Sequence, residues 1–358
     1  MGCCDHKETN RKITGKQSIR FGDDVYVVGC AAIAGKMEGE GPLGAYFDVV
    51  ETDPMFGKNT WEEAESMMLG MAVDVAVHKS GLQKSQIRCL VGGDLLGQLI
   101  ATSFGIENFD IPLLGVYGAC STMGEALLVA STLVDGGYAD YSLAITSSHF
   151  AGAEKQFRFP LAYGSQRPLA ATWTVTGSGA TIIGKKEQPE SAFTKEFSPV
   201  HICVRGATIG KIVDYGVKDS MNMGACMAPA AADTIRQHLT DFKRQPDYYD
   251  RIITGDLGMV GRDILFDLLK ENGFDITSNH MDCGIEIYDP EVQDTHSGGS
   301  GCGCSAITLN GYIFQKMRKG DWNRVLFVPT GALLSTVSFN EGQSVPGIAH
   351  AVVLETDQ

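Results

Sequence analysis

The segment Asp110–Ala130, DIPLLGVYGACSTMGEALLVA, contains an apolar run, a tight turn and a helix-like run in succession. Pro112–Tyr117 predicts a buried strand, Gly118-Ala119 predicts the turn, and small residues recur from Ser121 onward. This order places Cys120 between a strand and the positive end of a helix dipole, where a thiolate or a bound anion is stabilised. Cys120 is therefore expected to face a pocket, although many free cysteines are small buried hydrophobes.

Composition indicates a large packed α/β chain. The 358 residues include 44% hydrophobic residues, 20% charged residues and 43 glycines, which suits an α/β protein with many tight turns. A net charge of −14 without a basic stripe argues against a nucleic-acid partner. The ten cysteines are scattered and no leader or spanning segment is recognisable, so we expect reduced thiols and an intracellular location.

The second half of the chain repeats the motifs of the first half in the same order. Five matches of this kind predict an internal duplication, with a polar arm over residues 1–18, one half over 19–185 and the other over 191–358. The matched pairs are Val25–Cys30 with Ile202–Gly210, 60–79 with 228–243, Arg88–Asp94 with Asp250–Asp256, Gly118–Ser121 with Gly301–Ser305, and Tyr141–Ile145 with Arg324–Val328.

Two such halves, with a cysteine at the strand-to-helix turn of the first, resemble the thiolase fold shared by thiolases and β-ketoacyl condensing enzymes. The resemblance covers roughly residues 20–358. It implies a five-layered αβαβα core and a homodimer in which the strand at Pro112–Tyr117 faces its mate. In those enzymes the cysteine accepts an acyl group and is polarised by two groups of the second half, either two histidines or a histidine and an asparagine.

The expected partners of Cys120 are missing from this sequence. Thr254-Gly255-Asp256 stands where the resemblance places the first histidine, and the second falls near Ser300. We therefore expect a chain that is not an enzyme, and keep a condensing or acyltransferase reaction through Cys120 as the alternative. No cofactor or metal is expected, because neither Cys302/Cys304 with His296 nor His280 with Cys283 has the two-pair spacing of a zinc site.

Longer segments resemble the stage V sporulation protein AD family of spore-forming Firmicutes across nearly the whole chain. They include Val91–Gln98, Tyr117–Met123, Ser147–Pro160, Arg167–Ala180 and Thr254–Gly258. The resemblance implies a receptor for dipicolinic acid, free or as its calcium chelate, which acts in uptake into the developing spore. It further implies a location in the forespore, peripheral to the spore inner membrane, and integral membrane subunits as partners. A structural scaffold for those subunits is a further alternative.

Dipicolinic acid is a flat pyridine with two carboxylates, so a receptor needs a slot with hydrogen-bond donors at both ends. Cys120 at a helix N-terminus would supply one end. The other end would come from a basic cluster in an otherwise acidic chain, and Phe157 would contact the ring. The residues of that cluster are Lys155, Arg158 and Arg167.

Asp94 and His149 complete the predicted ligand-binding set. Both follow the carboxyl ends of predicted strands, where the sites of open α/β sheets lie. Asp94 would orient His149 or a water, or meet Ca²⁺ through its oxygens, but it would equally cap the following helix. Because Asp256 repeats Asp94 in the second half, a structural role for both is also open.

Overall fold

The core of the first half is a mixed sheet of five strands, which joins the corresponding sheet of the second half at a single residue pair, Tyr26 with Cys203. In the computed structural model, which describes residues 12–157, 167–185 and 200–357, the last strand of this half lies antiparallel between the first and the fourth. The other neighbours are parallel. In spatial order the strands are β3 (Tyr26–Gly35), β9 (Gly177–Gly184), β7 (Tyr141–Ser148), β5 (Cys89–Asp94) and β6 (Leu113–Gly115).

The second half repeats this sheet with the same order and the same strand directions. Even the irregularity of the first strand is repeated, because the register slips between Val27 and Gly29 in one half and between Val204 and Gly206 in the other. The predicted duplication of the α/β halves is thus confirmed. The strands are β10 (His201–Thr208), β17 (Ala351–Asp357), β14 (Arg324–Val328), β11 (Arg251–Thr254) and β12 (His280–Asp282).

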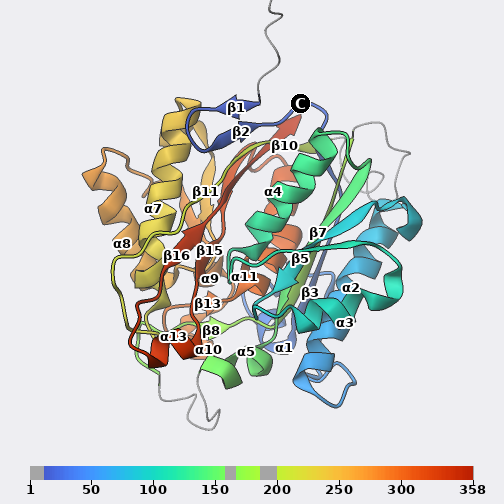
Figure 1. Cartoon of the computed structure of the whole chain (residues 1–358), viewed down its shortest axis with the longest axis horizontal. Coiled ribbons are helices and arrows are strands. Elements are labelled where there is room, and N and C mark those ends of the chain that lie inside the picture. The colour runs from blue at the N-terminus through green and yellow to red at the C-terminus, as the bar shows by residue number, and fades with distance from the viewer. Residues whose placement is uncertain (1–11, 158–166, 186–199, 358) are drawn as a thin grey trace, which may run out of the picture.

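Helices complete the predicted five-layered αβαβα core (Figure 1). One helical layer lies between the two sheets, so β7 is covered on both faces and is apolar or small along nearly its whole length. The outer layers are α2 (Trp61–Ser80) with α3 (Ile100–Ile106), and α7 (Met223–Phe242) with α8 (Gly258–Glu271). The central layer is α4 (Thr122–Asp135) with α11 (Cys302–Ile307), a π-helical turn (Thr308–Ile313) and α12 (Phe314–Arg318).

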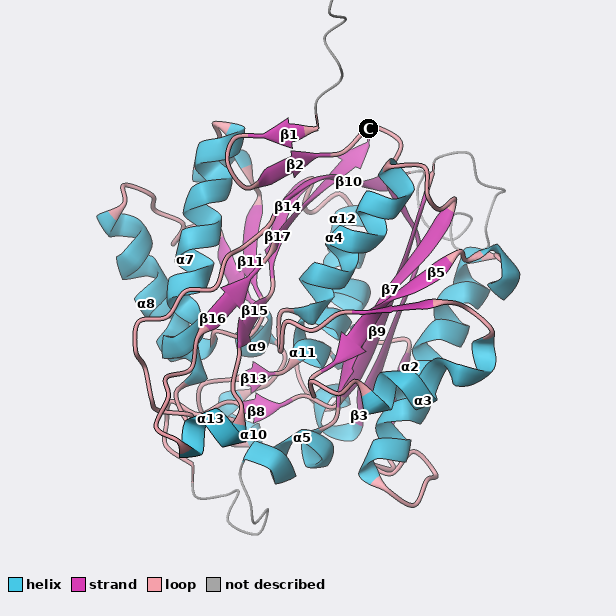
Figure 2. Cartoon of the chain, in the orientation of Figure 1, coloured by secondary structure: helices cyan, strands magenta, loops and turns pink. Residues whose placement is uncertain are grey.

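Short elements join these layers (Figure 2). The short helices are α1 (Lys36–Gly39), α5 (Phe150–Phe157), α9 (Cys283–Glu286), α10 (Pro290–Gln293) and α13 (Thr336–Asn340). The short strands are β1 (Ile13–Thr14), β2 (Ser18–Arg20), β4 (Val49–Glu51), β8 (Trp173–Thr174), β13 (Gly299–Ser300), β15 (Thr330–Ala332) and β16 (Gly347–Ala349). Within the described ranges, no helix has both the length and the apolar character needed to cross a bilayer.

Two local predictions need correction. β1 and β2 form a hairpin, and β2 pairs with β10, so the residues from Ile13 onward that were placed in the polar arm are part of the sheet. The strand before Cys120 was predicted to be buried, but β6 lies at the edge of the sheet. Leu114 is 47% exposed and Tyr117 is 37% exposed, because no further strand of the described chain covers that edge.

Candidate functional site

The turn after β6 places Cys120 where the sequence predicts it, just before α4. Ala119 adopts a left-handed backbone conformation with φ of 50°, which reverses the chain sharply. Two hydroxyls then fix the turn, since Ser121 donates to the carbonyl of Gly118 at 2.7 Å and Thr122 donates to that of Ala119 at 2.6 Å. The thiol of Cys120 is thus held in one position at the centre of the molecule.

The space beside Cys120 is small. Its side chain is buried and packs with Leu95, Ala153 and Cys302, and Phe157 at the end of α5 lies against the same cluster. The cavity that these groups leave has a volume of about 20 Å³. Such a volume holds about one water molecule, whereas small-molecule sites usually measure about 300–1,000 Å³.

A carboxyl group of the second half reaches this cysteine. Asp256 follows β11 and accepts hydrogen bonds from the backbone N–H of Gly301 at 2.9 Å and the hydroxyl of Thr330 at 2.8 Å. The Cys120 thiol lies close enough to this carboxyl for each group to shift the pKa of the other. Asp256 was not in the predicted set, although its place, where the thiolase resemblance expects a histidine, was a signal for it.

Burial decides the protonation of this pair. Burial, and next the neighbouring Asp256, raise the pKa of the Cys120 thiol well above its usual value. Burial also raises the pKa of Asp256 to about 7, although the hydrogen bonds that it accepts oppose the shift. The prediction that the helix N-terminus stabilises a thiolate at Cys120 is therefore wrong for this structure, because desolvation and a neighbouring acid outweigh the dipole.

Asp94 forms hydrogen bonds with the segment that follows it in the chain. Its carboxyl accepts from the backbone N–H of Leu96 at 3.0 Å, and from both the N–H (3.0 Å) and the hydroxyl (2.8 Å) of Thr102. These bonds occupy both oxygens and fix the chain that leads from β5 into α3. The capping alternative is the one that the local geometry favours, and the helix starts at Ile100 rather than at Leu95.

His149 and Lys155 face α2. The imidazole contacts the ring of Trp61 at 5.4 Å between centroids, and its Nε2 lies 2.8 Å from the carbonyl oxygen of Pro54. Burial lowers the pKa of His149, which keeps the ring neutral near pH 7. Lys155 forms an ion pair with Glu62. The predicted partner Arg158 lies outside the described residues.

Arg167 has a buried guanidinium with few hydrogen bonds. Its side chain is 2% exposed, and its guanidinium lies 4.6 Å from the ring centroid of Trp173, which stacks on Phe150 at 4.1 Å. Nη2 donates to the carbonyl of Asp294 at 2.7 Å. Nε and Nη1 are buried and have no hydrogen-bond partner among the residues that the structure describes. Arg167 therefore keeps unused donors.

The predicted ligand residues thus fall into separate places. Cys120 and Phe157 line one small cavity, and His149 and Lys155 lie together beside α2. Thr174 also lines the Cys120 cavity, whereas its neighbour in β8, Trp173, carries the Arg167 contact. Successive side chains of a strand point to opposite faces, so β8 separates Arg167 from Cys120.

No cluster of three or more histidine, cysteine or acidic side chains arranged to hold a metal occurs among the described residues. The thiol of Cys302 donates to the carbonyl of Ser147 at 2.9 Å, and the thiol of Cys304 donates to that of Gly255 at 3.7 Å. Both sulfur atoms are therefore engaged with backbone oxygens.

Comparison with known proteins gives the chain two kinds of relative. The family model for stage V sporulation protein AD matches residues 15–355. Stage V sporulation protein AD of Bacillus subtilis (strain 168) is 45% identical over 344 residues, which cover 96% of this chain and 98% of the relative.

The chain is also similar to solved structures, but at such low sequence identity that the similarity establishes the fold alone. The chain is similar to 3-oxoacyl-[acyl-carrier-protein] synthase III from Aquifex aeolicus VF5, with a TM-score of 0.54, 12% identity, and coverage of 92% of this chain and 99% of that chain. It is also similar to acetamide-bound OleA of Xanthomonas campestris, with a TM-score of 0.58, 13% identity, and coverage of 94% and 99%. The condensing-enzyme architecture predicted from the sequence is confirmed.

Proposed function

Because the chain belongs to the stage V sporulation protein AD family, we propose that it is a receptor for dipicolinic acid that takes part in uptake of this acid into the developing spore. The observation that carries the proposal is the buried guanidinium of Arg167. Two of its nitrogens are without a hydrogen-bond partner among the described residues. Leaving such donors unpaired in the interior costs about 1–3 kcal/mol, a cost that a bound carboxylate would remove.

The surroundings of Arg167 suit one end of dipicolinate. Nε and Nη1 lie on different edges of the guanidinium, and each shares its edge with Nη2, which donates one N–H to Asp294. A carboxylate pairs with two N–H groups of one edge at once, so it would accept from Nε or Nη1 together with the second N–H of Nη2. Trp173 and Phe150 form an aromatic stack beside the guanidinium, with rings inclined by only 12°. A flat pyridine ring adds well to such a stack. In this proposal one carboxylate of the ligand pairs with Arg167 and the ring lies near Trp173.

The surroundings of Cys120 argue against acyl transfer. A cysteine nucleophile needs a thiolate and a base, and condensing enzymes supply polarising partners from the second half of the chain. Here an acid, Asp256, neighbours the thiol, and burial together with this acid raises the pKa of Cys120. A neutral thiol in a cavity of about 20 Å³ is a poor acyl acceptor.

The thiolase-like fold is also consistent with the alternative function, a Cys-dependent acyltransferase or condensing enzyme. Incubation with acetyl- or malonyl-coenzyme A, followed by intact mass spectrometry, distinguishes the two functions. The receptor proposal expects an unmodified chain. A stoichiometric acyl adduct on Cys120 would establish a Cys-dependent acyltransferase or condensing enzyme instead.

The proposal includes the protein's location and its membrane partners. A forespore location, peripheral to the spore inner membrane, requires that integral membrane subunits hold the protein there. The net charge of −14 supports such indirect attachment, since anionic lipid repels an acidic protein. If the protein were only a scaffold for those subunits, variants of Arg167 would sporulate normally, while variants that release the subunits would fail.

Calorimetry tests the ligand directly. Dipicolinate is titrated into the wild-type protein, Arg167→Lys and the control Arg262→Lys, which alters an arginine paired with its neighbour Asp263 at the surface. We expect saturable binding that weakens at least about tenfold in Arg167→Lys, because lysine is a point donor, and that persists in the control. Isophthalate, which lacks the ring nitrogen, should bind more weakly. Absence of dipicolinate binding to the wild type would end the proposal.

A further inference from the structure

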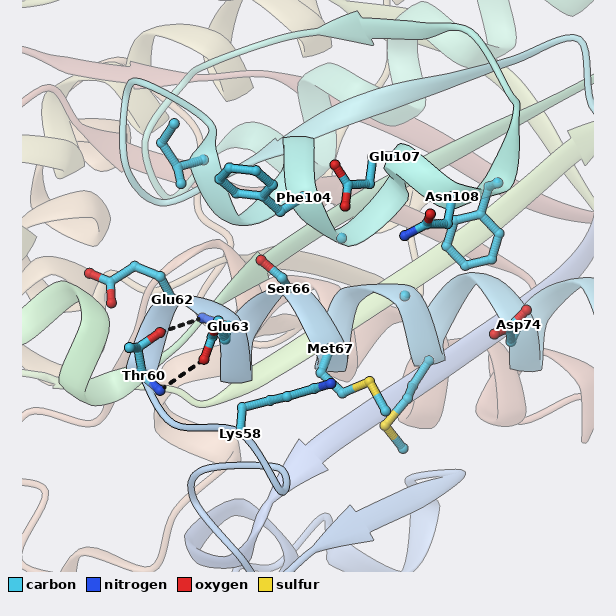
Figure 3. A pocket seen from close by; sticks show the side chains of 15 residues that line it. Lys58, Thr60, Glu62, Glu63, Ser66, Met67, Asp74, Phe104, Glu107 and Asn108 are labelled. Carbon is cyan, nitrogen blue, oxygen red and sulfur yellow. Dashed lines mark hydrogen bonds between the residues drawn. The ribbon is translucent and has the colours of Figure 1, made fainter.

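A groove lies between α2 and α3 on the outer face of the first half, away from the site described above. Its volume is about 660 Å³. The α2 wall runs from Glu62 to Asp74, a length of roughly 18 Å at the rise of an α-helix. Figure 3 shows Ser66 and Met67 on α2 and Phe104 and Glu107 on the opposite wall.

Two glycines shape the floor of the groove. A Cβ atom on Gly70 would lie 3.1 Å from the backbone oxygen of Gly105, and one on Gly105 would lie 2.8 Å from that of Ser66. The two helices therefore touch through their backbones at the floor. Larger side chains are confined to the walls, which leaves an open channel along α2.

The walls expose apolar surface to solvent. Met67 is 41% exposed, Ile100 is 46% exposed and Phe104 is 58% exposed, and Met71 and Phe109 line the groove beside them. A contiguous exposed patch of this kind marks an interaction site more often than scattered apolar residues do. Methionine and phenylalanine adapt to the ridge of an amphipathic helix, and the groove is long enough for about three turns.

The rim of the groove is acidic. Its charged residues are Glu62, Glu63, Asp74, Glu107 and Lys58. Lys155 pairs with Glu62 and Lys84 pairs with Asp74, so four acids face three lysines and the rim keeps a net charge of −1. A second copy of the chain would bring another acidic rim and a charge of −14, so the charge favours a cationic occupant.

We propose that the α2–α3 groove binds a basic amphipathic helix of a partner protein, with apolar side chains against Met67 and Phe104 and lysines or arginines facing the acidic rim. Segments of this kind adjoin the membrane in integral membrane proteins, where lysine and arginine concentrate on the cytoplasmic side. The proposal does not depend on dipicolinate binding.

The test uses the full-length protein and synthetic peptides of about 18 residues, enough for five helical turns. One labelled peptide carries leucines on one helical face and lysines elsewhere, a second has the same composition in scrambled order, and a third has glutamates in place of the lysines. Fluorescence anisotropy measures binding. We expect the amphipathic basic peptide to bind saturably, and the scrambled and acidic peptides to bind at least about tenfold more weakly.

Two matched variants separate the groove from general charge attraction. Phe104→Glu and Val337→Glu each add one negative charge at an exposed apolar position, but Val337 (67% exposed) lies on α13, which is not part of the groove. Phe104→Glu should weaken binding of the basic peptide at least about tenfold, whereas Val337→Glu should leave it unchanged. Circular dichroism confirms that both variants are folded.

Three outcomes would overturn this proposal. Equal binding of the scrambled peptide would show charge attraction alone, and unchanged binding to Phe104→Glu would place the contact elsewhere. A change from dimer to monomer caused by Phe104→Glu, measured by light scattering, would assign the groove to a contact between copies of this chain.

Discussion

Cys120 and Asp256 are two buried acidic groups, one from each half of the chain, and burial raises the pKa of both. Asp256 accepts from Gly301 and Thr330 of the second half, and the thiol comes from the first half. Because no described cation neutralises Asp256 in its hydrogen-bond set, the cost of burial appears as a raised pKa. The pair therefore favours neutral groups at the place where a condensing enzyme needs a reactive sulfur.

The pH dependence of stability follows from Asp256. Its pKa is about 7 in the folded chain and roughly 3.9 in an unfolded one, so the native state binds the proton more tightly. This contribution to stability is fully present below about pH 4 and is lost as the pH rises through about 7. We predict that Asp256→Asn loses less stability than the wild type between pH 5 and pH 8, by at most about 3 kcal/mol, because only about two pKa units of the shift fall within this window.

Urea unfolding at the two pH values measures this difference. Asp267→Asn, which alters an exposed aspartate on α8, is the control and should behave like the wild type. An identical pH dependence in Asp256→Asn and the wild type would show that Asp256 is ionised in the folded chain throughout this range.

Residue types and their order predicted the place of Cys120. They did not predict the hydrogen-bond partners of the aspartates near it. Asp94 and Asp256 follow matching strands of the two halves. Asp94 accepts a hydrogen bond from Thr102 in the helix that follows its own strand. Asp256 accepts one from Gly301, near Cys120. That choice depends on packing between the halves, which the strand-end pattern does not specify.

At the scale of elements, local chemistry predicted some helix ends and missed others. α2 begins after Thr60, which forms a capping box with Glu63, and ends before Gly81, which is left-handed with φ of 73°. Both signals can be recognised in the sequence. α7 was expected from Ala228 but begins at Met223, after an Asn222 cap. Pro229 is typical of a helix start, yet here it lies inside the helix, where its side chain is buried.

α5 controls access to Cys120. Ala153 and Phe157 lie one helical turn apart and pack against the cysteine cluster, while Phe150 stacks on Trp173. We predict that Phe157→Ala enlarges the cavity of about 20 Å³ and speeds alkylation of Cys120 by iodoacetamide severalfold, because the sulfur then meets solvent.

Peptide mass spectrometry after timed alkylation measures the rate at Cys120. Phe104→Ala, which removes a ring that is 58% exposed on α3, should leave that rate unchanged. If Phe157→Ala also leaves it unchanged, α5 is not the barrier that protects the thiol.

At the scale of the whole molecule, the order of the motifs predicted the duplication because each half needs the same strands to close its sheet. The match of individual residues was less accurate. Cys304 was paired with Cys120, but α11 begins at Cys302, so Ser300 occupies the place two residues before the helix. Ser300 in turn lines the Cys120 cavity. Both turns contain several small residues, so the sequence alone did not fix which residue of the second half corresponds to Cys120.

The exposed edge of the first sheet supports the proposed homodimer. β6 presents unpaired backbone groups beside Leu114, which is 47% exposed, and such an edge favours pairing with another strand. We predict a particle of twice 38.4 kDa by light scattering at micromolar concentration. Leu114→Lys should shift it toward the monomer, whereas Val337→Lys should not. A stable wild-type particle of 38.4 kDa would contradict this prediction.

The proposed receptor function is tested most directly by a crystal structure of the protein with dipicolinate. We predict one ligand carboxylate within hydrogen-bond distance of Nε or Nη1 of Arg167, with the pyridine ring beside Trp173, since these donors lack partners among the described residues. A ligand seated against Cys120 with Arg167 untouched, or density for no ligand at saturating dipicolinate, would contradict it.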